Sequence, residues 1–370
     1  MLARLRVSVG RAIGALAVGG ALACGAVFAG AGPAAADTIK LIAIDGYPAR
    51  AMWVKEFSEF FIPEVNKRLA ETGNHEIEWQ EAYGGTIVKP KGVLEGIELG
   101  LGDIGIVTTV FHNSKLPSQA IAFVTPFIST DARVVAKAVD EIAKEFPQMA
   151  AELEAQNQVY LATGVVLDTY QVFSTEPITA LKDIEGKKVA GAGFNLRYLE
   201  GLGAAGVRGG LTDFYNMLQT GVVDQAMLWP EAAMTFKIHE VAPHMLQANL
   251  GAVNSKTVTV NKDVWERLPE EVQTVLQEVA VDYRDHVAEV AMGRAAESVE
   301  KFKAAGGEVV ELSAEERAAW AQSMPNIAVE WAKGLDEAGA PGSDMLIAYI
   351  EKLKAAGQEP ARDWSAELSN

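Results

Sequence analysis

The sequence predicts an α/β protein of two lobes, with a ligand cleft between them and one long helix that spans both. Three observations predict this class. Strand patterns alternate with helical patterns in two separate stretches of the 370 residues. A later strand pattern, at residues 257–261, suggests that the chain crosses back to its first lobe. A helical stripe then follows Pro269 for roughly 36 residues, which is longer than one small lobe.

The first stretch supplies five elements in the order strand, helix, strand, helix, strand. Buried-strand patterns occupy residues 38–46 and 104–110, and a third strand pattern lies in residues 76–85. Apolar residues recur at helical spacing in residues 52–71, and residues 91–103 predict a short helix. This alternation predicts a parallel sheet covered by helices.

The second stretch repeats the pattern after a helical region at residues 132–155. Its predicted elements are strands at 158–166, 170–174 and 187–193, a helix at 195–202, and a helix followed by a strand within 214–229. Such sheets bind ligands at the carboxyl ends of their strands, so we expect the cleft to lie between the two lobes.

The length of the chain beyond residue 36 exceeds what one hydrophobic core usually supports, so we expect two domains. We assign residues 37–165 and 255–294 to the first lobe, and residues 166–254 and 295–340 to the second. Residues 341–370 are assigned to a C-terminal helix and tail.

The long helix begins at Pro269, with two acidic residues in its first turn, and ends at Gly306. At 1.5 Å per residue it would be about 54 Å long and would span both lobes. The alternative is the coiled-coil seam of a dimeric scaffold or sensor. Tyr283 and Ala295 interrupt any strict heptad, so we expect a monomer.

The first 36 residues predict an export signal. Three arginines precede an apolar run that begins at Ala12, and residues 34–36 offer the small side chains that signal peptidase prefers. Cleavage after Ala36 would release the protein into the periplasm. A retained membrane anchor is one alternative. Lipoprotein processing at Cys24 is a weaker one, because Ala21 stands where a leucine is expected.

Charge and cysteine content argue against several classes of function. The net charge of −17 becomes −20 without the three arginines of the leader, and the only cysteine, Cys24, leaves with it. Disulfides, cysteine nucleophiles and cysteine-ligated metals are therefore not expected in the mature chain. The acidic balance also argues against nucleic acid, whose phosphates require a basic surface, and against anionic membranes.

The sequence lacks the usual motifs for catalysis and cofactor binding. Residues 191–193 could start a dinucleotide loop, but Leu196 stands where its third glycine belongs. No phosphate-loop, zinc-protease or nucleophile-elbow motif occurs. His239 and His244 are five residues apart, which does not place both on one helical face for a metal. We therefore expect no cofactor, no metal and no enzyme.

Four segments, in this order along the chain, resemble the solute-binding proteins of tripartite ATP-independent periplasmic (TRAP) transporters. They are VLEGIELGLGDIGI (93–106), FVTPF (123–127), DIEGKKVAGAG with the downstream DFYNMLQTGVVDQAMLWPEA (183–232), and VNKDVWERLPEEVQTVLQEVA (260–280). The resemblance extends over essentially the whole chain after the leader. It implies a two-lobed periplasmic-binding-protein fold, an organic acid as ligand, and delivery of that acid to a membrane permease.

The chain departs from this family where the ligand is held. Most members bind an organic acid through an arginine two residues beyond the Lys-Lys pair, and here that position is Ala190. A second basic residue, common upstream of it, would fall near Tyr170. Because a buried carboxylate needs a partner, we predict that Arg197 binds the acid together with Asn195 and the free N–H groups of the following helix. The alternative for Arg197 is a solvated surface position.

Aromatic residues are expected to form the rest of the site. Trp229 falls where the resemblance places a ligand contact, ahead of Pro230 at a strand end. Other aromatic residues at strand ends or helix starts near the expected cleft are Tyr170, Phe194, Tyr83, Phe111, Tyr47 and Trp53. For any single aromatic residue the alternative is core packing. Aromatic residues in place of arginines favour a carboxylate with an aromatic or extended apolar body.

We therefore predict a periplasmic receptor of a TRAP transporter, which binds such an acid and passes it to the permease subunits. One alternative keeps the receptor but changes its ligand to a neutral or zwitterionic solute. Another is a periplasmic enzyme that uses cleft carboxylates such as Asp45 or Asp168.

Overall fold

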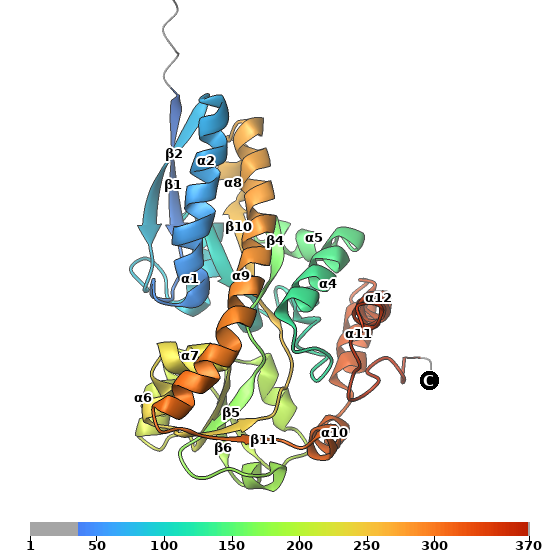
Figure 1. Ribbon diagram of the computed structural model, residues 1–370. Coiled ribbons are helices and arrows are strands. Elements are labelled where there is room, and N and C mark those ends of the chain that lie inside the picture. Colours follow the sequence, from blue (N-terminus) through green and yellow to red (C-terminus); the bar gives the residue numbers. More distant parts are fainter. Residues whose placement is uncertain (1–35, 369–370) are drawn as a thin grey trace, which may run out of the picture. The chain divides into compact units, whose positions relative to one another are not determined.

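A computed structural model describes residues 36–368 of the chain (Figure 1). The expected leader, residues 1–36, lies outside the described residues except for Ala36, as does Cys24, so the cleavage site stays a prediction. Within residues 36–368, no helix is both long enough and apolar enough to cross a membrane.

Five strands form the first sheet. Their order is β2 (His75–Ala82), β1 (Asp37–Ile44), β3 (Ile104–Thr108), β10 (Asn254–Asn261) and β4 (Gln158–Val166). β1 is parallel to β2 and β3, as the sequence predicts. β10 runs antiparallel between β3 and β4, so the predicted all-parallel sheet is in fact mixed. This strand carries the chain back to the first sheet, which confirms the predicted crossing.

Helices cover the first sheet. The predicted helix at 52–71 consists of α1 (Met52–Glu56), a π-helical turn (Phe57–Phe61) and α2 (Ile62–Thr72). Pro63 follows the turn and has no N–H to donate, so the regular bonding of the helix is interrupted there. The remaining helices of this lobe are α3 (Val93–Glu98), α4 (Ala132–Glu145) and α5 (Gln148–Glu154).

Six strands form the second sheet. Their order is β11 (Glu308–Glu311), β9 (His244–Gln247), β5 (Gln171–Ser174), β8 (Gln225–Leu228), β6 (Lys188–Gly191) and β7 (Ala205–Arg208). β6 is parallel to both of its neighbours, whereas β5 is antiparallel to both of its own, so this sheet is also mixed. Its helices include α6 (Phe214–Gln219) and α7 (Pro230–Thr235).

The helix predicted at 195–202 is shorter and tighter than expected. It is a 3-10 helix over Phe194–Leu199. Gly201 and Gly203 follow with φ of 88° and 70°, in the left-handed region that ends a helix. Six residues of 3-10 helix carry a much smaller dipole than a full α-helix, which weakens the predicted anion site at its start.

The long helix is α9 (Glu270–Ala304), which packs against β4 and α4 of the first lobe and against α7 and β11 of the second (Figure 1). The predicted helix spanning both lobes is therefore confirmed. Two contacts of α9 are buried in the first lobe: the Tyr283 hydroxyl donates to the Trp53 carbonyl at 2.6 Å, and Arg284 pairs with Asp140 at 2.6 Å.

The chain ends with α10 (Ala314–Ser323), α11 (Ile327–Glu337) and α12 (Gly342–Ala355), after the short α8 (Lys262–Trp265) that precedes α9. α12 packs against α11 and α4. The Trp364 indole N–H donates to the Pro126 carbonyl at 2.8 Å, which ties the C-terminal segment to the first lobe. The residue boundaries given above for the two lobes stay a prediction.

Candidate functional site

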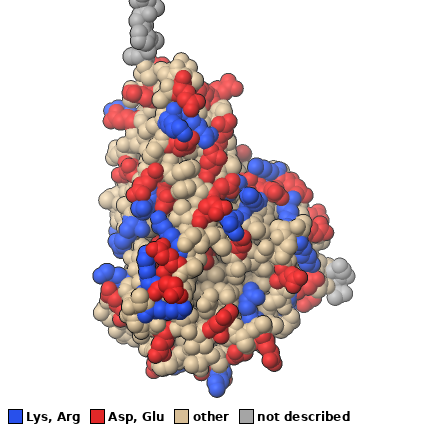
Figure 2. Space-filling view, in the orientation of Figure 1, with Lys and Arg blue, Asp and Glu red and all other residues tan. Residues whose placement is uncertain are grey.

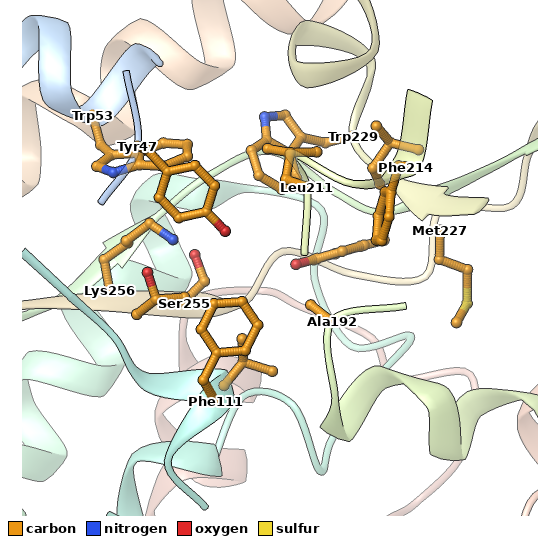
Figure 3. A pocket seen from close by; sticks show the side chains of 14 residues that line it. Tyr47, Trp53, Phe111, Ala192, Leu211, Phe214, Met227, Trp229, Ser255 and Lys256 are labelled. Carbon is orange, nitrogen blue, oxygen red and sulfur yellow. The ribbon is translucent and has the colours of Figure 1, made fainter. Parts of the chain in front are cut away.

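A cleft lies between the two sheets (Figure 3). In this closed form the lining side chains nearly fill it and leave a cavity of about 20 Å³, room for about one water molecule, so the lobes must part to admit a ligand. Its lining residues from the first lobe are Tyr47, Trp53, Thr108, Val110, Phe111, Ser255 and Lys256. Those from the second lobe are Ala192, Leu211, Phe214, Met227, Leu228 and Trp229, and Tyr170 lies on a segment that connects the sheets. All except Phe111 and Ala192 are buried, so the cleft is closed in this structure.

Lys256 is the buried cation of this cleft. It lies in β10, every residue of which is buried, and is itself only 3% exposed. Its Nζ lies 4.3 Å from the ring centroid of Trp53 and 5.4 Å from that of Tyr47. Within residues 36–368 no salt bridge to a carboxylate neutralises this amine, although Asp45 is near enough to influence its pKa. Burial lowers the pKa of Lys256 to about 8, opposed by the nearby Asp45 carboxylate.

Asp45 holds the two aromatic residues that cover the amine. One of its carboxylate oxygens accepts the backbone N–H of Tyr47 at 2.7 Å, and the other accepts the indole N–H of Trp53 at 3.0 Å. Burial raises the pKa of Asp45 to about 7, although both hydrogen bonds and the charge of Lys256 act in the opposite direction. Asp45 itself does not line the cleft, so it acts through Tyr47 and Trp53.

Two hydroxyl groups next to Lys256 lack partners. Thr108 Oγ1 and Ser255 Oγ are buried, and neither has a hydrogen bond within the described part of the chain. Figure 3 shows the Ser255 hydroxyl, the Lys256 amine and the Tyr47 hydroxyl on one side of the cavity. Buried polar groups are rarely left unsatisfied, so a cluster of this kind is expected to meet a ligand or water.

The opposite side of the cleft is apolar. Leu211, Phe214 and Trp229 lie across the cavity from the polar cluster in Figure 3, and Met227 lies farther from it. The indole N–H of Trp229 donates away from the cavity, to Glu231 at 3.3 Å, and leaves the ring as a wall. That ring lies 6.3 Å from the ring of Trp53 and 5.7 Å from the ring of Tyr170, so the two lobes meet through aromatic contacts.

The structure brings five of the nine predicted site residues together. Tyr47, Trp53, Phe111, Tyr170 and Trp229 all line the cleft. Tyr83, Phe194 and Asn195 do not. Tyr83 and Phe194 are half-buried and pack against the hydrophobic core. Asn195 is buried, and its side-chain oxygen accepts the backbone N–H of Ala192 at 3.0 Å, which shapes the turn before the 3-10 helix.

Arg197, the predicted anion contact, lies outside the lining of the cleft. Its guanidinium pairs with Glu200 at 2.9 Å and with Glu330 at 2.8 Å. Two carboxylates of the chain already neutralise this cation, and a ligand would have to displace them. Ala190, at the family's arginine position, is fully buried within β6 and also lies outside the lining.

Sequence reasoning missed the polar end of the site, namely Lys256, Ser255 and Thr108. One signal could have found it. The segment Asn254–Asn261 (NSKTVTVN) is a buried-strand pattern that contains a lysine, and a lysine is almost never fully buried without a partner. In the part of the chain that the structure describes, no cluster of three or more histidine, cysteine or acidic residues could hold a metal.

Comparison with known proteins identifies matches over most of the chain. The family model "Bacterial extracellular solute-binding protein, family 7" (DctP) matches residues 52–334. The chain is 28% identical over 256 residues to the ectoine-binding periplasmic protein TeaA of Halomonas elongata, a match that covers 67% of this chain and 73% of TeaA. It is 28% identical over 254 residues to the C4-dicarboxylate-binding periplasmic protein DctP of Rhodobacter capsulatus, covering 67% and 74%.

Solved structures share the fold at lower identity. A TRAP solute-binding protein from Rhodoferax ferrireducens, in complex with copurified benzoate, has a TM-score of 0.77 and 18% identity and covers 86% of this chain and 98% of its own. A marine metagenome TRAP solute-binding protein specific for aromatic acid ligands has a TM-score of 0.74 and 21% identity, covering 86% and 99%. These likenesses show the two-lobed fold.

Proposed function

The chain belongs to family 7 of the bacterial extracellular solute-binding proteins, and from this premise we propose that it is the receptor of a TRAP transporter for an organic acid. The proposed ligand has a carboxylate and an aromatic or extended apolar body. It binds in the cleft, the lobes close on it, and the loaded receptor delivers it to the membrane permease. A ligand with a carboxylate and an apolar body accounts for the lining residues.

One observation carries this proposal, namely the composition of the closed cleft. Its lining contains one amine and no carboxylate, and its other side chains are aromatic, aliphatic or hydroxyl-bearing. An amine favours an acid over a base, because opposite charges attract strongly where water is excluded. The aromatic and aliphatic walls favour a ligand with an apolar body, whose burial adds binding energy in proportion to its area.

A zwitterionic ligand is the second candidate. It is favoured by the relative TeaA, whose name describes binding of ectoine, and by the aromatic rings that surround the cavity. Rings of this kind attract cations. In this chain, however, Lys256 already occupies the space over the faces of Tyr47 and Trp53, so a cationic group there would meet a like charge.

Members of this family are receptors for solutes, and we propose that this chain catalyses no reaction. The two carboxylates that an enzyme could use, Asp45 and Asp168, are not placed to act on a ligand in the cleft. Both oxygens of Asp45 are engaged by Tyr47 and Trp53, and Asp168 does not line the cleft. Prolonged incubation with a bound acid, followed by mass spectrometry, should return the acid unchanged, and any product would contradict the proposal.

The remaining parts of the proposal concern location and partners. We propose a periplasmic monomer with a cleaved leader, and the lobe boundaries 37–165 with 255–294 and 166–254 with 295–340. Acidic and basic side chains are interspersed over the face shown in Figure 2, and the net charge of −17 becomes −17 − 3 = −20 without the leader. This balance suits a soluble receptor and disfavours nucleic acid as a partner.

Two measurements test the proposed function. The first is mass spectrometry of the solutes that the purified protein releases on denaturation. The second is thermal unfolding in the presence of aromatic acids, aliphatic acids, dicarboxylates, polyols and ectoine, because a ligand that binds only the folded state raises the melting temperature. Stabilisation by carboxylic acids is expected. Stabilisation by polyols or ectoine alone would contradict the organic-acid proposal.

A further inference from the structure

We propose that Lys256, Ser255 and Thr108 form a subsite for a single carboxylate, and that the cleft selects monoanionic acids over dianions and cations. This inference rests on the proposed function, since it names the class of acid that the same cleft would take. It is carried by the backbone geometry of β10, by the missing partners of two hydroxyl groups beside a buried lysine, and by the apolar character of the facing wall.

The backbone brings the three polar side chains to one place. Lys256 is the direct partner of Thr108 in the antiparallel pairing of β10 with β3, so their side chains lie on the same face of the sheet. On its other edge, β10 pairs Asn254 with position 166 and Lys256 with position 165, which leaves Ser255 as one extra residue. Such a bulge turns consecutive side chains toward one face, and both Ser255 and Lys256 line the cleft.

These groups match a carboxylate. The ammonium has three N–H donors, and each hydroxyl can turn its hydrogen toward a ligand oxygen. Both hydroxyl oxygens are buried without a partner in the described residues, and the lysine beside them is 3% exposed. Asp45 does not neutralise this lysine, because its oxygens are bonded to Tyr47 and Trp53 and no ion pair joins it to Lys256. A ligand carboxylate would satisfy all three groups together.

The facing wall explains the selection against a second charge. Leu211, Phe214, Met227 and Leu228 offer no donor, and the indole N–H of Trp229 is bonded to Glu231. Tyr170, whose ring lies 5.7 Å from that of Trp229, also lines the cleft, and its hydroxyl can bond a neutral oxygen of the ligand but cannot neutralise a charge. Arg208, an exposed cation of the second lobe, lies outside the lining, with one guanidinium nitrogen 3.4 Å from a Cβ built on Gly193. A second carboxylate would therefore be buried without a cation.

The test compares matched ligands by titration calorimetry. The monoacids are benzoate, phenylacetate, pyroglutamate and octanoate. The comparison compounds are the amides of these acids and the diacids terephthalate, 1,4-phenylenediacetate and suberate. We expect the tightest monoacid to bind at least tenfold more tightly than its amide and than the diacid with the same body. Equal or tighter binding of the diacid would overturn the inference.

Variants test the assignment to Lys256. We expect Lys256→Met to weaken binding of the tightest monoacid at least tenfold and to reduce its preference over the amide to less than threefold. The matched control is Lys91→Met, which removes another lysine, one whose Nζ lies 5.5 Å from the ring centroid of Phe111 but which is not in the lining. Thr108→Val removes one hydroxyl without changing charge and should weaken binding by a smaller factor.

The outcomes separate this inference from the proposed function. Unchanged affinity of Lys256→Met for a monoacid would overturn the subsite and leave the organic-acid receptor intact. Failure of all four monoacids to bind would overturn both. If Lys256→Met does not unfold cooperatively, Thr108→Val and the diacid comparison decide the inference alone, because neither changes a charge of the protein.

Discussion

The amine of Lys256 lies 4.3 Å from the centre of the Trp53 ring, over its face. The indole is held in this position because its N–H donates a hydrogen bond to Asp45. The ring attracts the ammonium and also excludes water from it. Lys256 is therefore a cation that the protein shields from water, and its protonation state changes within an experimentally accessible pH range.

The first prediction is that acid binding weakens above pH 8. Burial lowers the pKa of Lys256 to about 8, so the free receptor loses this charge as the pH rises through that value. A carboxylate binds the charged form, so binding at higher pH must first take up a proton. The dissociation constant of the tightest monoacid should rise by about tenfold per pH unit between pH 8.5 and 9.5.

Lys256→Arg is the control for this titration. An arginine stays charged throughout, so the variant's dissociation constant should stay flat between pH 8 and 9.5 even if its value at pH 7 differs. Asp45, Tyr47 and Tyr170 also face this region, and burial raises the pKa of each. The variant retains all three. An equally steep loss in Lys256→Arg would therefore assign the titration to one of them.

The second prediction concerns Arg197. Replacement by alanine should leave the dissociation constant of every acid within twofold of the wild-type value, because the guanidinium is paired with Glu200 and Glu330 outside the cleft. These pairs are partly exposed, so the free energy of unfolding should fall by less than about 1 kcal/mol. Calorimetric titration alongside chemical denaturation checks both values. A tenfold loss of affinity would restore Arg197 as a ligand contact.

Much of the fold could be predicted from the sequence, because each element carried its own periodic signal. Strands β1, β3 and β8 contain short apolar runs and the long helix α9 carries apolar residues at helical spacing, and these signals do not depend on distant contacts. The direction of a strand has no such local signal. β10 has the composition of a buried strand in either orientation, and only the crossing of the chain makes it antiparallel.

The site was harder to predict for a related reason. Tyr47, Trp53, Phe111, Tyr170 and Trp229 could be proposed because aromatic residues at strand ends commonly face a cleft. Lys256 could not be ranked above Arg197 by position, since both lie at the edge of a predicted element. What separates them is whether a carboxylate of the chain is near enough to pair, and that depends on tertiary contacts that α11 supplies for Arg197 through Glu330.

The third prediction is that stability falls as the pH rises from 5 to 7.5. Burial raises the pKa of Asp45, Glu152 and Asp168 to about 7 each. Between its unfolded pKa of about 4 and its folded pKa, each group binds more protons in the folded state, so the free energy of unfolding decreases with pH. Carboxylates whose pKa is lowered, such as Asp131 and Asp183, change their contribution to the free energy of unfolding only below about pH 4.

Glu152→Gln tests this account away from the cleft. Glu152 accepts the Ser118 backbone N–H at 3.0 Å and the Ser118 hydroxyl at 2.6 Å, and a glutamine oxygen can replace part of this bonding. Urea denaturation gives the unfolding free energy at pH 5 and at pH 7.5. The difference between these two values should be about 2 kcal/mol smaller in the variant than in the wild type. An unchanged difference would assign the pH dependence to other groups.

The fourth prediction concerns closure of the cleft at Gly193. This residue has a φ of 144°, and a Cβ built on it would lie 2.9 Å from the carbonyl oxygen of Val110 in the other lobe. Gly193→Ala should therefore keep the lobes slightly apart. Because the closed cleft encloses the ligand, the dissociation constant of the tightest monoacid should rise about tenfold, equivalent to about 1.4 kcal/mol. Small-angle X-ray scattering should show less compaction on ligand addition than in the wild type.

Gly203→Ala provides the matched control, because it separates backbone strain from contact between the lobes. Gly203 also has a positive φ, of 70°, but its added Cβ would meet only the side chain of Glu185 in the same lobe, at 3.2 Å. Both variants should lose about 1 kcal/mol of stability from the strained backbone. Only Gly193→Ala should also lose affinity and compaction. Equal affinities in the two variants would mean that binding does not require the close approach of Gly193 to Val110.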